Sequence, residues 1–179
     1  MIFRTFIHMF RSRWRSKLAP HDVGSLRLRV LPTDLDVLGH MNNGVYFSIM
    51  DLGRMDLMIR SGLWPKLRAR GWFPVMASAT LTFRKSLQPW QLFDLETRIV
   101  GYDTKAVFVE QRFVVDGEIF AAGIAKARFL KKGGAVSLAE LSELTGVDVT
   151  TLAPPEWVLA WSAGAALPSS RAAAPSVWP

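Results

Sequence analysis

Residues 33–46, TDLDVLGHMNNGVY, are the most informative part of this chain. Two aspartates, a histidine and two asparagines fall within residues 34–43, between a strand-like run and a long apolar segment. So many hydrogen-bonding groups in one loop indicate a functional site. We predict that Asn43 is the N-cap of a helix that starts near Gly44, because an Asn side chain there accepts a hydrogen bond from an unpaired backbone N–H.

The first-turn amides of that helix would carry partial positive charge and form an anion site. Asp36 lies upstream in the same loop, so folding can bring its carboxylate opposite those amides. A base or nucleophile facing amide donors is what acyl transfer requires. We therefore predict Asp36 as the catalytic carboxylate and the N–H groups of Asn43 and Gly44 as the oxyanion hole. The alternative is that Asp36 caps its own loop in an Asx-type turn.

The pattern D-x-D-x-x-G-H-x-N-N-x-x-Y, followed by an apolar helix, resembles the hot-dog-fold thioesterases of the 4-hydroxybenzoyl-CoA thioesterase superfamily. The version here is most similar to the branch called thioesterase superfamily member 6-like. The similarity continues through DLGR (51–54) and FRKSL (83–87) and covers roughly residues 24–132. It implies a hot-dog fold, Asp36 as the catalytic carboxylate, and a site between two subunits, hence a homodimer or a dimer of dimers.

The other polar residues of the loop each have two interpretations. His40 can hydrogen-bond Asp36 or the substrate carbonyl, or it can tie the loop to a backbone carbonyl. Asp34 is interpreted as a loop cap or a salt-bridge partner. Tyr46, the last residue of the pattern, is predicted to contact substrate.

Further substrate contacts are predicted on the strand that follows the helix. Arg84 and Lys85 are candidates for binding the phosphates of coenzyme A, and the alternative is a solvated strand end. Met76 is predicted to line an acyl channel together with Trp72 and Phe73. For these three residues the alternative is a core or dimer contact.

Periodicity predicts the order of elements. Residues 24–31 alternate apolar and polar, as a strand with one wet face does, and residues 44–60 are apolar on most sides, as a buried helix is. Strands are predicted at 75–87, 92–102, 105–115 and 118–130, with a tight Asp116-Gly117 hairpin turn. This order indicates an α+β domain. With the resemblance, it indicates a hot-dog fold, an antiparallel curved sheet wrapped around a long central helix.

Two features of the predicted central helix bear on its packing. Gly53 lies in mid-helix, where a missing side chain costs roughly 1 kcal/mol relative to Ala, so we expect the sheet to pass close by. Asp51 and Arg54, and Asp56 and Arg60, are spaced to pair along the helix, and we expect both pairs at the surface. Beyond the sheet, Ser137 and Glu140 form the pattern of a helix capping box.

Composition narrows the possible functions. The formal charge is +7, from 22 Lys and Arg against 15 Asp and Glu, but five of the basic residues lie within residues 1–20 with no acid. A basic excess confined to one end argues against nucleic acid as a partner. The absence of cysteine excludes a thiol nucleophile and disulfides. Three scattered histidines predict no metal site.

We divide the chain into a basic amphipathic segment (1–22), a hot-dog domain (23–134), a helical extension (135–161) and a disordered tail (162–179). For residues 1–20 three interpretations remain open: a helix packed on the domain or frayed, a helix on a membrane surface, and an organelle-targeting peptide. The apolar run is too short to span a bilayer. The expected location is cytoplasmic, with peripheral membrane contact through this segment.

The sequence therefore predicts a thioester hydrolase of lipid metabolism that acts on acyl-CoA or an acyl-carrier protein. It needs no cofactor, since coenzyme A is part of the substrate. The alternatives are a non-catalytic acyl or lipid binder at a membrane surface and a hot-dog dehydratase. The acyl group, aliphatic or aromatic, is not specified by the sequence.

Overall fold

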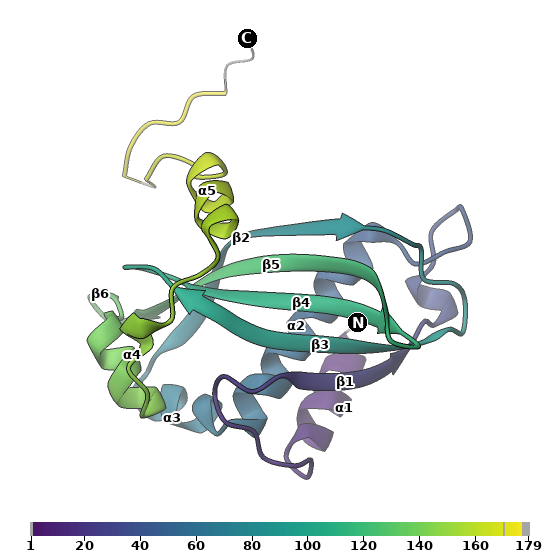
Figure 1. The fold of residues 1–179 in the computed structure, drawn as a ribbon, viewed down its shortest axis with the longest axis horizontal. Helices are drawn as coiled ribbons and strands as arrows, with labels where there is room; N and C mark the ends of the chain where they lie inside the picture. Colours follow the sequence, from purple (N-terminus) through teal and green to yellow (C-terminus); the bar gives the residue numbers. More distant parts are fainter. Residues whose placement is uncertain (1, 170, 177–179) are drawn as a thin grey trace.

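The computed structural model describes residues 2–169 and 171–176, without the side chains of residues 2 and 3. The predicted disorder of the tail therefore falls partly on residues outside this range. A six-stranded antiparallel sheet curves around one long helix (Figure 1). In chain order the elements are α1 (Ile2–Ser12), β1 (Gly24–Arg29), α2 (Asn43–Arg60), α3 (Leu63–Ala69), β2 (Phe73–Phe83), β3 (Leu92–Tyr102), β4 (Val107–Val115), β5 (Glu118–Lys131), β6 (Gly134–Ala135), α4 (Leu138–Thr145) and α5 (Glu156–Gly164).

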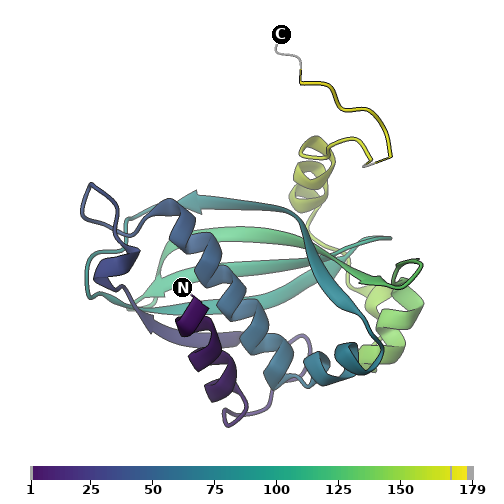
Figure 2. The ribbon, with the colours of Figure 1, turned by 180° about the vertical axis from the view of Figure 1, so that it is seen from behind.

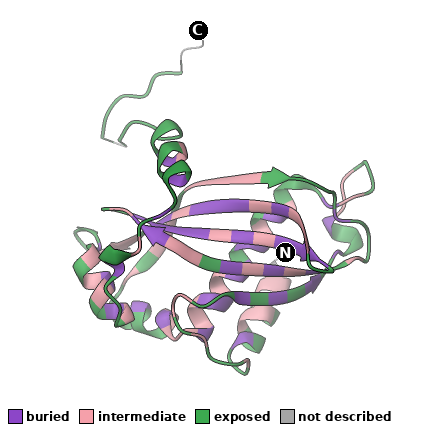
Figure 3. Cartoon of the chain, in the orientation of Figure 1, coloured by how far each residue is buried: buried purple, intermediate pink, exposed green. Residues whose placement is uncertain are grey.

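The strand order is β1-β3-β4-β5-β2, and the short β6 pairs with β5. β1 and β2 are therefore the outer strands of the main sheet. The central strands are largely buried, whereas β2 is half-buried to exposed along its length (Figure 3). The predicted hot-dog architecture is confirmed. The Asp116-Gly117 turn is also confirmed, with positive φ at both residues, as a two-residue hairpin with a primed turn requires.

Helix α2 lies against the concave face of the sheet, and α1 lies beside α2 (Figure 2). Gly53 is where α2 and the sheet approach most closely. A Cβ at this position would lie 2.5 Å from Thr97 Oγ1 and 2.6 Å from a Leu95 methyl group. The expectation that the sheet passes close to this glycine is confirmed.

The C-terminal helices cover the sheet from two sides. In α4 the predicted capping box is confirmed, with Ser137 as the N-cap and Glu140 at its third position. Val158 of α5 packs on Phe108 and Ile124, whose side chains point away from α2 because strand side chains alternate between faces. Trp64 and Pro65 lie in the first turn of α3. Proline is tolerated there, where a helix needs no N–H.

Candidate active site

The loop between β1 and α2 folds back on itself and presents Asp36. The Asp36 N–H donates to the His40 carbonyl at 2.9 Å, and the Gly39 N–H donates to the Asp36 carbonyl at 3.0 Å. Gly39 has a φ of +79°, which glycine adopts without strain. Val37 and Leu38 form the tip of this hairpin, and both are strongly exposed. The loop therefore places an apolar tip next to the predicted catalytic carboxylate.

Asp36 keeps part of its hydrogen-bonding capacity unused. Its Oδ1 accepts from the Leu38 N–H at 2.9 Å, which is the Asx-type turn of the alternative interpretation. Its Oδ2 lies 3.5 Å from His40 Nδ1, longer than an ordinary hydrogen bond. The side chain is about one-fifth exposed, and no Lys or Arg of the described chain pairs with it. Capping of the loop thus leaves one carboxylate oxygen open to another partner.

His40 lies beside this carboxylate. Its Nδ1 is buried and has no hydrogen-bond partner among the described residues. An unpaired buried polar atom is costly, so such atoms are rare in folded proteins. Of the interpretations offered for His40, the structure favours a side chain that faces Asp36, while its backbone carbonyl accepts the Asp36 N–H.

The prediction of Asn43 as the N-cap of α2 is wrong by one residue. Asn42 has the extended backbone of a cap, and its Oδ1 accepts the Gly44 N–H at 2.8 Å. The Gly44 amide is therefore already bonded, which removes one of the two predicted oxyanion donors. The Asn43 N–H has no acceptor within the described chain. The helix end thus offers one backbone donor near the loop.

Asp34 is a structural residue, as its predicted capping role implied. It is buried, and its Oδ2 accepts the Leu31 N–H at 2.9 Å and a bond from Arg4 Nη1 at 2.8 Å. Its backbone carbonyl also accepts the Asn42 N–H. The two aspartates of the loop thus differ in environment: Asp34 is buried and pairs with Arg4, whereas Asp36 is partly exposed and pairs with no Lys or Arg of the described residues.

The structure contradicts the predicted substrate contact of Tyr46. This residue is only 1% exposed, and its ring packs edge-on against Phe83 and Phe113. Its hydroxyl accepts the Leu87 N–H at 3.1 Å, and burial raises its pKa. Tyr46 ties the start of α2 to the loop after β2. A core position of this kind could not have been distinguished from a site position by the motif spacing alone.

Arg84 and Lys85 lie in the segment that follows β2, at the same end of the sheet as the Asp36 loop (Figure 1). Both side chains pair with Glu118, at 2.7 Å and 2.6 Å, and these pairs lower the pKa of Glu118. All three side chains are exposed. The structure therefore places two cations at the same end of the sheet as the candidate site, both paired with one carboxylate.

An apolar cavity of about 180 Å³ lies between the second half of α2 and the concave face of the sheet. Met76 lines it, as predicted for an acyl channel, whereas Trp72 and Phe73 do not. Leu63 and Leu67 of α3 and Leu141 and Leu144 of α4 form other parts of its wall. Its lining does not include Asp36, His40 or Asn43. A helix rises ~1.5 Å per residue, so the cavity begins ~12 Å along α2 from the candidate catalytic loop.

The polar wall of this cavity was not predicted from the sequence. Arg54 and Asp51 form an ion pair, and Arg54 Nη1 donates to Gln111 Oε1 at 2.6 Å. Asp51 is exposed as predicted, but the Arg54 side chain is largely buried, and burial lowers its pKa. The helical spacing of the pair was visible in the sequence, but its position at a cavity depends on the sheet that packs above it.

Comparison with known proteins places this arrangement in a family. The model of the thioesterase-like superfamily matches residues 30–162. The chain belongs to this superfamily. The chain is 41% identical over 99 residues to Protein THEM6 of Xenopus laevis, covering 55% of this chain and 48% of that protein. It is 26% identical over 114 residues to a probable thioesterase of Saccharomyces cerevisiae, covering 62% of this chain and 48% of that protein.

Among solved structures the fold is similar to that of YbaW, a probable thioesterase from Escherichia coli. The TM-score is 0.64 at 21% identity, over 70% of this chain and 98% of YbaW. The superfamily membership supports a thioesterase-like function. The chain spans about half the length of the curated relatives named above.

Proposed function

We propose that this protein is an acyl-CoA thioesterase in which Asp36 is the catalytic carboxylate. The observation that carries the proposal is the environment of Asp36: one oxygen is bonded within its loop, the other is 3.5 Å from a histidine, and no Lys or Arg of the described residues pairs with it. Asp34 in the same loop differs: it is buried, it pairs with Arg4, and its Oδ2 also accepts the Leu31 N–H. The membership of the thioesterase-like superfamily supports the same reaction class.

In the proposed reaction Asp36 takes a proton from a water molecule, which attacks the thioester carbonyl carbon. The carbonyl oxygen becomes an oxyanion that accepts a hydrogen bond from the Asn43 N–H at the positive end of α2. Collapse of the tetrahedral intermediate breaks the carbon–sulfur bond, and coenzyme A leaves as a thiolate that is protonated by the acid form of Asp36. In the alternative route Asp36 attacks directly and forms an acyl anhydride that water then hydrolyses.

His40 is the proposed positioning residue for Asp36. Its buried Nδ1 faces the carboxylate oxygen at 3.5 Å, and a small movement of the loop would turn this contact into a hydrogen bond. Catalytic hydrogen bonds are commonly long in unliganded enzymes and shorten when substrate binds. Such a bond would orient the carboxylate toward the water.

The proposed substrate lies along α2. Arg84 and Lys85 would bind the phosphates of coenzyme A near the loop. Their contacts with Glu118 would be replaced by contacts with these more highly charged groups. The apolar cavity beyond Asp51 would receive the far end of the acyl group. Since ~12 Å of helix separates the two, only an extended acyl chain would fill the cavity with its carbonyl at Asp36. This geometry favours an aliphatic substrate over a compact aromatic one.

We also propose that the active form is a homodimer that pairs through β2. This strand is an edge of the sheet, and Phe73, Met76 and Phe83 along it are exposed. An uncovered edge strand with apolar side chains favours pairing with a second copy. The exposed Val37 at the loop tip would then be covered by the partner, which would close the site.

Light scattering on wild type and on Val37→Asp tests the proposed dimer. The wild type is expected at twice the chain mass, and the variant is expected at the chain mass with reduced activity. A monomeric, active wild type would refute it.

The reaction is tested by an acyl-CoA panel of increasing chain length, run on wild type, Asp36→Asn and the control Asp94→Asn. Asp94 is a partly exposed carboxylate of β3 that pairs with Arg27. We expect Asp36→Asn to lower kcat by roughly 10²–10⁴-fold, the usual contribution of a general base, and Asp94→Asn to leave it unchanged. No turnover by wild type on any acyl-CoA or acyl-carrier protein, with lipid in the purified protein, would instead favour the acyl binder.

A further inference from the structure

Helix α1 is packed against the domain by its polar face. An amphipathic surface helix normally buries its apolar side. Here the apolar side chains point outward, with exposed fractions of 65% for Phe6, 57% for Ile7, 60% for Phe10 and 67% for Trp14 in the turn that follows the helix. Phe10 and Trp14 stack edge-on at 4.2 Å and form a continuous aromatic surface. These four side chains therefore contribute little to the core.

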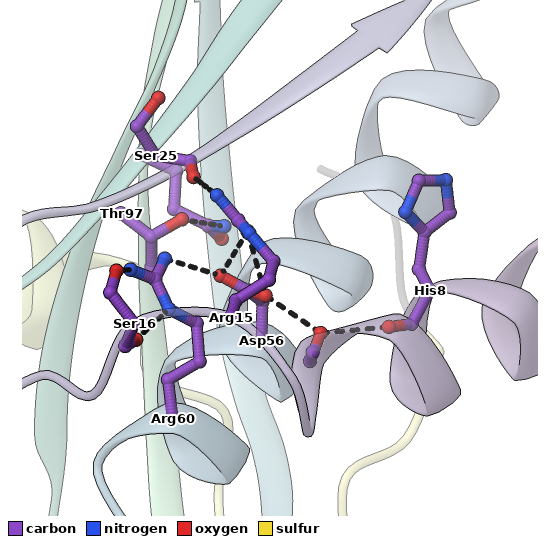
Figure 4. A network of polar contacts seen from close by, with 9 residues as sticks. His8, Arg15, Ser16, Ser25, Asp56, Arg60 and Thr97 are labelled. Atoms are coloured by element: carbon purple, nitrogen blue, oxygen red, sulfur yellow. Dashed lines mark hydrogen bonds and ion pairs between the residues drawn. The ribbon is translucent and has the colours of Figure 1, made fainter.

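Buried carboxylates hold the segment in this orientation. Asp56 on α2 is buried and accepts hydrogen bonds from the Ser12 hydroxyl at 2.7 Å and from Arg15 Nη1 at 2.9 Å (Figure 4). It also pairs with Arg60, whose guanidinium bonds Ser16. At the other end of α1, Arg4 binds Asp34. Because these bonds have fixed partners on α2 and in the loop before it, they turn the polar face of the helix inward.

Cations surround the outward face and have no partner of their own. The side chains of Arg11, Arg13, Lys17 and Arg68 are exposed and form no hydrogen bond or ion pair within the described part of the chain. Residues 1–21 contain no acid. Arg13, Lys17 and Arg68 line a groove of about 320 Å³ together with Met9, Ile59 and Trp64. An apolar ridge thus stands beside a groove that carries only positive charge.

We propose that this face, Phe6, Ile7, Phe10 and Trp14 with Arg11, Arg13, Lys17 and Arg68, docks on the surface of an anionic lipid bilayer. The apolar side chains would enter the boundary between headgroups and acyl chains, and the cations would bind lipid phosphates. None of the helices in the described residues is long and apolar enough to cross a bilayer, so the contact is with one surface. The docking does not depend on the proposed chemistry.

Charge complementarity favours a lipid surface over a second copy of the chain. A twofold contact through this face would bring the same four cations of both copies together, and no carboxylate lies between them. Anionic headgroups supply the missing negative charge. The docking face is also close to the proposed acyl site, because α3 turns Trp64 and Arg68 toward the groove and Leu63 and Leu67 toward the apolar cavity.

Cosedimentation of the full chain with vesicles tests the proposal. We compare vesicles of phosphatidylcholine alone with vesicles that also contain phosphatidylserine. Binding is expected only with phosphatidylserine and is expected to weaken as salt is raised. No sedimentation with either vesicle, or equal sedimentation with both, would overturn the proposal.

Two pairs of variants separate the apolar and the charged contributions. Trp14→Glu is expected to lower binding at least about tenfold, whereas Trp157→Glu, at a similarly exposed Trp of α5, is expected to leave it unchanged. The double variant Arg13→Gln with Lys17→Gln is expected to bind more weakly and with a smaller salt dependence. The double variant Lys105→Gln with Lys132→Gln is its control and is expected to bind as the wild type does. Equal binding by wild type and Trp14→Glu would refute docking through this face. A dimer that dissociates in Trp14→Glu would also refute it, because a second copy of the chain would then occupy this face.

Discussion

The two ends of α2 present carboxylates in opposite ways. At the C-terminal end Asp56 is buried and bonded by Ser12, Arg15 and Arg60. At the N-terminal end Asp36 is partly exposed and bonded only by its own loop, with a histidine at 3.5 Å. A fully bonded carboxylate can stabilise the fold but has no capacity left for a substrate. The carboxylate at the C-terminal end of α2 therefore stabilises the fold, whereas the one at the N-terminal end is available for the proposed chemistry.

The largest expected effect is on stability, in Asp56→Ala. This change would leave the guanidinium of Arg60, whose side chain is 6% exposed, buried without its partner, and breaking a buried pair in this way costs about 3–5 kcal/mol. Urea unfolding measures the loss. As a control, Glu143→Ala removes an exposed carboxylate from its exposed pair with Arg70 and is expected to cost at most about 1 kcal/mol. Equal losses for both variants would contradict the distinction between the two ends.

A much smaller effect on stability is expected for Asp36→Asn. The asparagine Oδ1 can still accept the Leu38 N–H, so the free energy of unfolding should change by no more than about 0.5 kcal/mol. The same urea titration measures it. If Asp36→Asn were destabilised as strongly as Asp56→Ala, the contrast between the two ends of α2 would be refuted. Asp36 would then be a structural anchor, and any loss of activity would be a loss of fold.

The smallest expected effect concerns Glu140, a partly exposed carboxylate bonded by Lys131 and by the Ser137 cap. These bonds lower its pKa from 4.5 to about 2. A group whose folded pKa is depressed stabilises the protein above its unfolded pKa, and that stability is lost as pH falls from 4.5 toward 2. The melting temperature of the wild type should therefore fall more steeply over this pH range than that of Glu140→Gln. If the melting temperatures of the two proteins fell in parallel, the bonds to Glu140 would contribute nothing to stability in solution.

Much of the fold could be predicted because it follows from local periodicity. The alternation of residues 92–102 and the Asp116-Gly117 turn specify strands and a hairpin without reference to the rest of the chain. Gly53 also predicted a tertiary contact, since a mid-helix glycine needs a neighbour that excludes a side chain. The cap of α2 was misplaced because Asn42 and Asn43 are both good caps, and only the loop hydrogen bonds select Asn42.

The candidate site was predictable only in part. Asp36 and His40 were found because they share one short loop, and the structure does bring them together. Tyr46 was assigned wrongly because a tyrosine in a motif can serve either the core or a ligand, and the aromatic rings of Phe83 and Phe113 that bury it come from distant strands. The pair Asp56 and Arg60 was expected at the surface and is buried under the segment before β1.

By itself the sequence determined the order of strands and helices, the polar loop that holds Asp36 and His40, and the amphipathic character of α1, because each depends on residues within a few positions of one another. The tertiary structure decided which face of α1 is turned inward, which aspartates are buried and where the apolar cavity lies. The reason is that Arg4 and Asp34, or Ser12 and Asp56, are separated by many residues. A pattern of hydrophobicity cannot show which distant charge a side chain will meet.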